Sequence, residues 1–195
     1  VCGNSIIWKP SPHSNGCAEG IKKAWDKVSG DYSDLRQILE GGKEEAVALC
    51  EDDRINLVSA TGSTQMGKEL APIVSARLGK LLLELGGNNA AIVCPSADLD
   101  LTIKGIAFSA CGTTGQRCTS LRRLFVHKDI YEDCVERLEQ CFGELVIGCP
   151  TKDSSQIGPL ISEESYNSMQ QTLKSLKDKN IKVIGGERLE IEKLD

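Results

Sequence analysis

The chain alternates short apolar runs with amphipathic segments. Apolar or β-branched runs predict strands at residues 5–9, 55–60, 80–85, 90–94, 121–126 and 181–186. Apolar residues at helical spacing predict helices over residues 14–28, 33–39, 43–50, 68–78, 98–111, 130–145 and 163–177. Ser14 and Asp98 each precede such a helical pattern and are candidate caps. The residues of chemical interest lie where these elements meet.

A strand, a glycine-containing loop and a helix follow one another between residues 55 and 78. This order is typical of an anion site, because the amino end of a helix presents unpaired N–H groups to a phosphate. The spacing from Gly62 through Gly67 to Lys68 matches all but the last position of the P-loop pattern, but Glu69 stands where that motif needs a hydroxyl for Mg²⁺. Nucleotide hydrolysis is therefore disfavoured. The three-glycine dinucleotide fingerprint is also absent, and a tight turn without a ligand is the alternative interpretation.

The apolar run at 80–85 carries one carboxylate, Glu84, near its end, and Gly86 and Gly87 follow it. Burying an unpaired carboxylate is costly, and low-dielectric surroundings raise the pKa of a carboxyl group towards the range useful for a general base. Glu84 is therefore a candidate general base on a buried strand. A structural glutamate paired with an arginine or a backbone N–H is the alternative.

Cys118 lies in the break Gly115–Ser120, between a predicted helix and a predicted strand. A thiol in such a place can face a cleft and attack a carbonyl, and a neighbouring cation such as Arg117 favours the thiolate form of a thiol. Cys118 is therefore a candidate nucleophile. A buried structural thiol is the alternative, because free cysteine is among the most buried residue types.

Lys9 ends the first apolar run and precedes Pro10. In an open α/β sheet the carboxyl ends of the strands form the edge at which ligands bind. Lys9 is therefore a candidate donor to the ribose or phosphate of a cofactor, and a solvated lysine is the alternative.

The composition is that of an ordinary globular protein. The chain has 195 residues, of which 40% are hydrophobic and 26% charged, and its formal net charge is −5. Because it carries no basic stripe, the sequence predicts no nucleic-acid partner. No apolar run reaches the roughly 20 residues that span a bilayer, and no secretory leader pattern opens the chain. We therefore expect no membrane partner and a cytoplasmic location.

The nine cysteines are an odd number and lack the paired spacing of zinc sites. Only two histidines accompany them. We therefore expect no metal, and free thiols in a reducing compartment, most of them buried as small core residues.

Four stretches in this order resemble the aldehyde dehydrogenase superfamily: Ile6–Pro10 (IIWKP), Thr61–Gly67 (TGSTQMG), Leu83–Asn89 (LELGGNN) and Gly115–Thr119 (GQRCT). The separation between Glu84 and Cys118 also fits that family. The last two stretches are specific in combination and are most similar to the antiquitin branch, the α-aminoadipic semialdehyde dehydrogenases.

The resemblance implies that Cys118 is the nucleophile, which adds to the carbonyl carbon of an aldehyde. It implies that Glu84 activates the water that hydrolyses the resulting thioester. In the antiquitin branch the arginine before the nucleophile helps to bind the carboxylate of the substrate, so Arg117 is the candidate for that role. The substrate implied is a small aldehyde, such as α-aminoadipic semialdehyde.

The resemblance also implies a cofactor, NAD or NADP, as the hydride acceptor. Lys9 would bind the adenosine ribose. Ser63 would meet the pyrophosphate at the helix terminus that Gly62 and Gly67 shape. Pro12 stands where many members of the family carry a glutamate that accepts from ribose hydroxyls, so the motif leaves the choice between the two cofactors open, while the branch favours NAD.

The fold implied is α/β. Residues 1–86 would form part of a Rossmann-like, parallel-sheet NAD(P)-binding domain, and residues 87–195 part of an α/β catalytic domain that bears the thiol. The chain begins without Met at an apolar run and stops within a charged stretch, so we interpret it as the central segment of a longer polypeptide. The full-length protein is expected to be a homo-oligomer.

Two catalytic elements of the family are not among these 195 residues: the asparagine of the oxyanion hole and the glutamate of an EEIFGP-like motif. Loss of one oxyanion donor costs about 10²- to 10³-fold in rate, so we expect the isolated segment to be inactive. A non-catalytic fragment used for binding or assembly is the alternative function.

Overall fold

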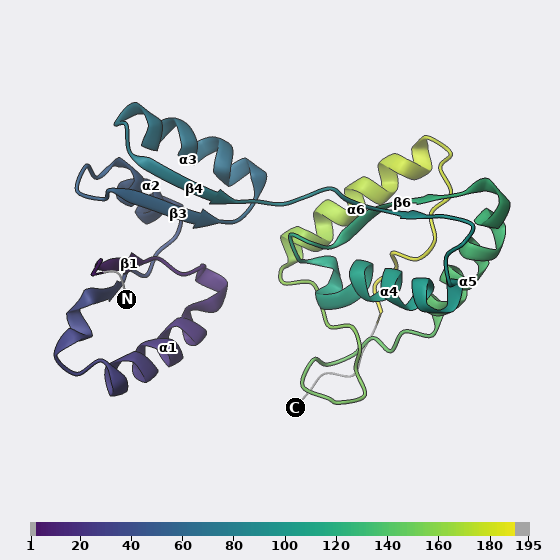
Figure 1. Ribbon diagram of the computed structural model, residues 1–195, viewed down its shortest axis with the longest axis horizontal. Coiled ribbons are helices and arrows are strands. Elements are labelled where there is room, and N and C mark those ends of the chain that lie inside the picture. The colour runs from purple at the N-terminus through teal and green to yellow at the C-terminus, as the bar shows by residue number, and fades with distance from the viewer. Residues whose placement is uncertain (1–2, 190–195) are drawn as a thin grey trace. The chain divides into compact units, whose positions relative to one another are not determined.

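The computed structural model describes residues 3–189. The chain divides into two units, and the boundary lies between Leu85 and Gly86. Each unit contains paired parallel strands with helices packed against them (Figure 1). The predicted α/β class is therefore confirmed.

The first unit begins with a parallel pair of strands, β1 (Ile6–Trp8) and β2 (Arg36–Ile38). A parallel pair needs a long crossover, and helix α1 (Asn15–Val28) provides it. Two 3-10 helices flank α1: η1 (Pro12–Ser14) and η2 (Gly30–Leu35). Ser14 occupies the predicted cap position of α1 but makes no capping bond, because its hydroxyl donates to the carbonyl of Ser11 at 3.1 Å instead.

The second pair of this unit is β3 (Leu57–Thr61) and β4 (Lys80–Glu84), again parallel. Helices α2 (Lys43–Glu51) and α3 (Thr64–Ala76) complete it. Its core contains the buried residues Cys50, Leu70 and Val74, against which Val58, Ala60 and Leu81 pack. Because strand side chains alternate between two faces, Leu57 and Leu82 point to the other face and are about half exposed, at 54% and 51%.

The second unit has a third parallel pair, β5 (Asn89–Val93) and β6 (Leu121–Val126). Its helices are α4 (Leu99–Cys111), η3 (Gly112–Gly115), η4 (Lys128–Ile130), α5 (Tyr131–Gly143) and α6 (Glu163–Asp178). Five buried side chains from β5, α4 and α5 form its core: Val93, Ile103, Ile106, Cys134 and Leu138. The predicted cap of α4 is confirmed, because Asp98 accepts a hydrogen bond from the backbone N–H of Leu101 at 3.1 Å.

Two predicted elements are wrong. Residues 33–39 do not form one helix but the end of the 3-10 helix η2 and strand β2, because Arg36 to Ile38 pair in register with Ile6 to Trp8. Residues 181–186 form no strand. Ile181 and Ile184 are 50% and 63% exposed, and within the described residues no strand lies beside them to supply the ladder that an isolated apolar run needs.

Helix α3 begins at Thr64, four residues before the predicted start. The reason is local, since Ser63 takes the cap position and its hydroxyl accepts from the backbone N–H of Met66 at 3.0 Å. The glycine loop is therefore shorter than predicted and leads directly into a helix terminus.

Across residues 3–189, every helix is too short or too polar to cross a membrane.

Candidate active site

Cys118 lies in the loop between η3 and β6, and its side chain is exposed. The loop is held through its backbone, because the side-chain amide of Asn89 donates to the carbonyl of Cys118 at 2.7 Å and to that of Ser120 at 3.0 Å. Ser120 is fully buried, and its hydroxyl accepts from the backbone N–H of Arg117 at 3.1 Å. The thiol is thus accessible to a small molecule while its peptide is anchored.

The segment that precedes this loop is strained. Thr113 and Thr114 have φ values of 55° and 56°, a left-handed conformation that β-branched residues rarely adopt. Such residues cost about 1–3 kcal/mol each and persist only where the surroundings enforce them. Here the hydroxyl of Thr114 donates to the carbonyl of Gly158 at 2.9 Å, and the backbone N–H of Ile161 donates to the side chain of Gln116 at 2.8 Å.

Arg117 lies against the carboxyl end of α4. Its guanidinium is 5.0 Å from the ring centroid of Phe108, and its Nη2 donates to the carbonyl of Phe108 at 3.1 Å. A cation there is favourable, because the last carbonyls of a helix carry partial negative charge. Its Nε is buried, and the described part of the chain supplies no acceptor for it. Gly112 leaves the space that the guanidinium occupies, since a Cβ at this position would collide with it.

Glu84 is exposed, so the predicted burial of this carboxylate is wrong. It ends β4 on the same face as Leu82, away from α3, and among the described residues of the first unit nothing covers that face. Its backbone carbonyl accepts from the N–H of Gly62 at 3.0 Å, and Thr61 is its partner in the register of β3 and β4. Glu84 therefore lies beside the glycine loop, at the carboxyl edge of this strand pair.

The glycine loop ends at a helix terminus that is suited to an anion. Ser63 and Thr64 are exposed, and the first turn of α3 carries no acidic side chain. The first N–H groups of a helix have no acceptor within it. Gly67 is buried and allows close packing of α3, because a Cβ there would approach Leu85 Cδ1 to 2.6 Å.

Glu69, which disfavours a P-loop by sequence, is paired with side chains of the same unit. Its carboxylate accepts from Lys43 Nζ at 2.7 Å and from the amide of Gln65 at 3.1 Å. These bonds hold the pKa of Glu69 below its ordinary value. The residue therefore ties α2 to α3.

Lys9 is half-buried at the carboxyl end of β1, so it is not simply a solvated lysine. Its Nζ donates to the carbonyls of Pro10 at 2.8 Å and Gly41 at 3.1 Å. An ammonium group has three N–H donors, so one remains for a ligand.

The predicted site residues thus fall into two sets, each described within its own unit. Lys9, Gly62, Ser63, Gly67 and Glu84 belong to the first unit. Arg117 and Cys118 belong to the second unit.

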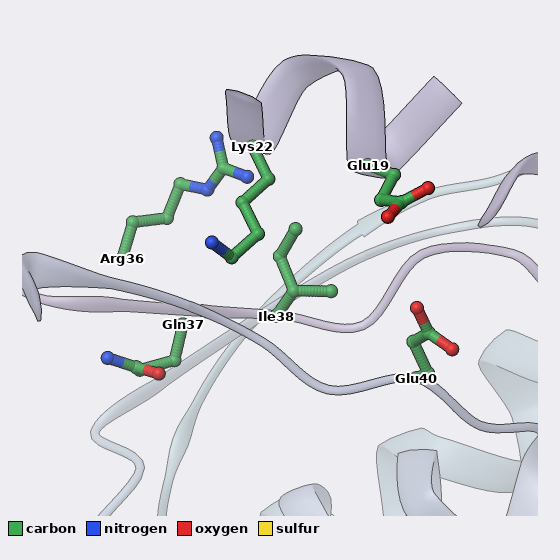
Figure 2. A pocket seen from close by; sticks show the side chains of 6 residues that line it. All are labelled: Glu19, Lys22, Arg36, Gln37, Ile38 and Glu40. Atoms are coloured by element: carbon green, nitrogen blue, oxygen red, sulfur yellow. The ribbon is translucent and has the colours of Figure 1, made fainter. Parts of the chain in front are cut away.

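An open depression lies elsewhere, between α1 and β2. Figure 2 shows Lys22 and Arg36 close to one another on one side of Ile38, with Glu19 and Glu40 on the other side. Lys22 pairs with Asp26 at 2.7 Å. None of the predicted site residues lines this depression. Its walls carry mixed charge and no nucleophile.

The cysteines are less buried than predicted. Among the described thiols only Cys50 and Cys134 are buried, whereas Cys17, Cys94 and Cys118 are exposed. Each unit has a small core in which helices pack on two-stranded pairs, so most positions remain near solvent. Burial raises the pKa of Cys50 and Cys134, which makes these two thiols unreactive. Within residues 3–189, no three His, Cys, Asp or Glu side chains are placed to hold a metal ion.

Comparison with known proteins assigns the chain to a family. The model for the Aldehyde dehydrogenase family matches residues 1–195, which is the whole chain. The chain belongs to the aldehyde dehydrogenase family.

Among curated members of the aldehyde dehydrogenase family, the α-aminoadipic semialdehyde dehydrogenase of Rattus norvegicus is 37% identical over 189 residues. The match covers 95% of this chain and 35% of the rat protein. The Arabidopsis thaliana protein named aldehyde dehydrogenase family 7 member B4 is also 37% identical, over 98% of this chain and 39% of its own length. The chain therefore spans about a third of the length of these relatives, and the predicted resemblance to the antiquitin branch is confirmed.

Solved structures of the family confirm the predicted aldehyde dehydrogenase fold. The Mycobacterium tuberculosis aldehyde dehydrogenase complexed with NAD⁺ is similar with a TM-score of 0.91 and 28% identity. That similarity covers 95% of this chain and 38% of the M. tuberculosis chain.

Asn89 is the residue of this aldehyde dehydrogenase chain whose contribution the sequence did not reveal. The glycines shortly before it indicate a turn. Its hydrogen-bond partners, Cys118 and Ser120, lie 29 and 31 residues further along the chain. Such contacts leave no local pattern. In the sequence, only the neighbouring pair Gly86 and Gly87 indicates that another part of the chain packs closely against the backbone here.

A second thiol of this aldehyde dehydrogenase chain, Cys149, is predicted to react at lower pH than an ordinary cysteine. The hydroxyl of Thr151 lies 3.0 Å from its Sγ and the backbone N–H of Thr151 at 3.4 Å, and these bonds lower the pKa of Cys149. Burial raises the pKa of Cys111. As pH rises, iodoacetamide should therefore label Cys149 before Cys111, as mass spectrometry of the tryptic peptides can show.

Thr151→Val should shift the labelling of Cys149 to higher pH, because it removes the hydroxyl bond to the thiolate. Thr172→Val is the matched control, since the hydroxyl of Thr172 donates within α6, to the carbonyl of Ser168 at 3.0 Å. Labelling of Cys149 that is unchanged by Thr151→Val would contradict this account of its pKa.

Proposed function

We propose that the protein containing this chain oxidises an aldehyde to a carboxylic acid, with Cys118 as the nucleophile and NAD as the hydride acceptor. The observation that carries this proposal is an exposed thiol on an anchored loop, in a chain that matches the aldehyde dehydrogenase family from end to end. The overall reaction consumes aldehyde, NAD⁺ and water and yields carboxylate, NADH and two protons.

In the first half of the reaction the Cys118 thiolate adds to the carbonyl carbon, and the carbonyl oxygen becomes a hemithioacetal oxygen. Bound NAD supplies a hydride acceptor for the hydrogen on that carbon. The product left on the protein is a thioester of Cys118. The exposure of Cys118 and the backbone bonds that fix its peptide support its assignment to this role.

In the second half of the reaction, Glu84 takes a proton from a water molecule as the water oxygen attacks the thioester carbon. The carbon–sulfur bond then breaks, which releases the acid and the thiol of Cys118. A general base contributes typically about 10²- to 10⁴-fold. The carboxylate of Glu84 is exposed and so accessible to the water that it would deprotonate. Its carbonyl accepts from the N–H of Gly62 in the loop proposed to hold the cofactor, which supports the assignment.

The residues of the first unit fit a dinucleotide. The exposed start of α3 offers N–H groups and carries no acidic side chain in its first turn, which suits a diphosphate, with Ser63 as the contact and Gly62 and Gly67 shaping the turn. The third N–H of Lys9 suits a ribose hydroxyl. We assign residues 1–86 to cofactor binding and residues 87–195 to the thiol chemistry. NADP is the second candidate cofactor, because the Escherichia coli relative described as an NADP dependent enzyme is also similar, with 28% identity and a TM-score of 0.90.

The substrate class we propose is a semialdehyde that carries a carboxylate, such as α-aminoadipic semialdehyde. The name of the rat relative supports this class. Arg117 is the proposed partner of the substrate carboxylate, since only one of its guanidinium donors has a partner among the described residues. We also propose that the full-length protein is a homo-oligomer and that the 195-residue chain alone is inactive.

Alkylation of the complete gene product containing this chain tests the proposal. Iodoacetamide should label Cys118 faster than the other exposed thiols, and saturating NAD should slow labelling at Cys118 alone. Cys17 and Cys94 are internal references, because both are exposed and neither has a proposed role. Protection by NAD but not NADP would settle the cofactor. Labelling of Cys118 at the rate of Cys94, with no effect of either cofactor, would favour a non-catalytic relative used for binding or assembly.

A further inference from the structure

We propose that Asn89 is a positioning residue for the nucleophile: its side-chain amide bridges the carbonyls of Cys118 and Ser120 and so fixes where the thiol lies. The inference rests on the proposed function, in which Cys118 attacks the aldehyde. Asn89 itself is not proposed to touch substrate or cofactor.

The bridge uses one nitrogen atom. Asn89 Nδ2 carries two N–H groups, and the two acceptors lie at 2.7 Å and 3.0 Å, so both donors are used. The two carbonyls belong to Cys118 and Ser120, on either side of Thr119. Because Asn89 is the first residue of β5, a strand of the sheet, the loop is tied to a rigid element.

Gly87 makes this close approach possible. A Cβ at position 87 would lie 3.0 Å from the carbonyl oxygen of Cys118 and 3.0 Å from Asn89 Oδ1, closer than such atoms normally come. The backbone of Gly87 therefore packs directly against the peptide of the thiol. The loop is bounded on this side by Gly87 and Asn89 together.

Cys118 and Thr119 depend most on this anchor, because Gln116, Arg117 and Ser120 have further hydrogen bonds of their own. Within the described residues, the side chains of Cys118 and Thr119 make no hydrogen bond. On the preceding side the chain passes through the left-handed residues Thr113 and Thr114, a conformation that needs support from its surroundings. Loss of the Asn89 bonds should therefore let the segment 116–120 relax.

Asn88 provides a matched comparison. It is exposed, and its contribution to this region is through the backbone, since its carbonyl accepts from Arg123 Nε at 3.0 Å and Nη2 at 2.8 Å. Truncating Asn88 leaves that carbonyl in place. Truncating Asn89 removes both donors to the thiol loop.

The experiment compares Asn89→Ala with Asn88→Ala in the complete gene product. Hydrogen exchange at the backbone amides of 116–120 should accelerate by about tenfold in Asn89→Ala and remain unchanged in Asn88→Ala. The pre-steady-state rate of NADH formation should fall by about 10- to 100-fold, because a misplacement of about 1 Å costs up to 10²-fold in rate. KM should stay within about threefold, since Asn89 binds no ligand.

A purely structural role for Asn89 gives a different result. In Asn89→Ala the fraction of active sites would then fall. The rate per active site and the hydrogen exchange of 116–120 in the folded protein would stay at the level of Asn88→Ala. That result would overturn the proposal. If Asn89→Ala does not fold, Asn89→Asp keeps the shape of the side chain and replaces the donors by acceptors, with Asn88→Asp as the charge-matched control. An unmodified protein that oxidises no aldehyde would contradict the proposed function instead, and the exchange comparison would still decide whether Asn89 holds the loop.

Discussion

Replacing Cys118 by alanine is expected to remove aldehyde oxidation by the complete gene product almost completely. Deleting a covalent nucleophile removes the step on which hydride transfer depends, and comparable deletions cost on the order of 10⁴- to 10⁶-fold in kcat. The measurement is NADH formation followed by absorbance at saturating aldehyde and NAD. Intact-mass spectrometry after rapid acid quench should also show loss of the acyl adduct.

The matched control is Cys94→Ala. Cys94 is an exposed thiol of the same unit and follows β5, with no proposed role. It should retain full activity. Both substitutions lie at the surface, so the free energy of unfolding of each should change by no more than about 0.5 kcal/mol.

If the Cys118→Ala variant kept a tenth or more of the kcat of the unmodified protein, with unchanged stability, the thiol would not be the nucleophile. Loss of activity in both variants would point instead to a general sensitivity of the second unit. Cofactor binding separates these cases further, because the dissociation constant for NAD should stay near its original value in Cys118→Ala if only the chemistry is lost.

Those parts of the structure that arise from local pattern were predictable from the sequence. Helix α4 ends at Cys111 as its apolar spacing and the following glycine indicate, and Asp98 caps it. The break that presents Cys118 follows from the same spacing. The glycine loop before α3 was also predictable. The helix itself begins earlier than its apolar spacing predicts, because Ser63 caps it.

The errors arise where a distant part of the chain decides the outcome. Arg36 to Ile38 form a strand because Ile6 to Trp8 lie beside them, and nothing within residues 33–39 encodes that partner. The exposure of Glu84 depends on which face of β4 the helices cover. The bridge from Asn89 to Cys118 depends on a contact across 29 residues of sequence.

Replacing Glu84 by glutamine is expected to separate the two halves of the reaction. The amide keeps the shape of the side chain but cannot accept the proton from water, so hydrolysis of the thioester should slow by about 10²- to 10⁴-fold. In the proposed mechanism, neither the attack by Cys118 nor the hydride transfer uses Glu84. A stopped-flow trace should therefore show a burst of about one NADH per active site, followed by a slow steady state.

The thioester provides the second readout. In Glu84→Gln it should accumulate on Cys118 and be visible by mass, and hydroxylamine should restore turnover because it attacks the acyl carbon without a general base. Glu51→Gln, at the exposed end of α2, is the matched control and should behave as the unmodified protein.

The exposure of Glu84 makes this experiment easy to interpret. An exposed carboxylate without a hydrogen-bond partner for its side chain among the described residues contributes little to folding, so stability should change by no more than about 0.5 kcal/mol. A fall in the steady-state rate without a burst would then mean that Glu84 acts before the thioester forms. Full activity in Glu84→Gln would mean that another base activates the water, and Glu84 would be only the residue whose carbonyl fixes Gly62 at the edge of the sheet.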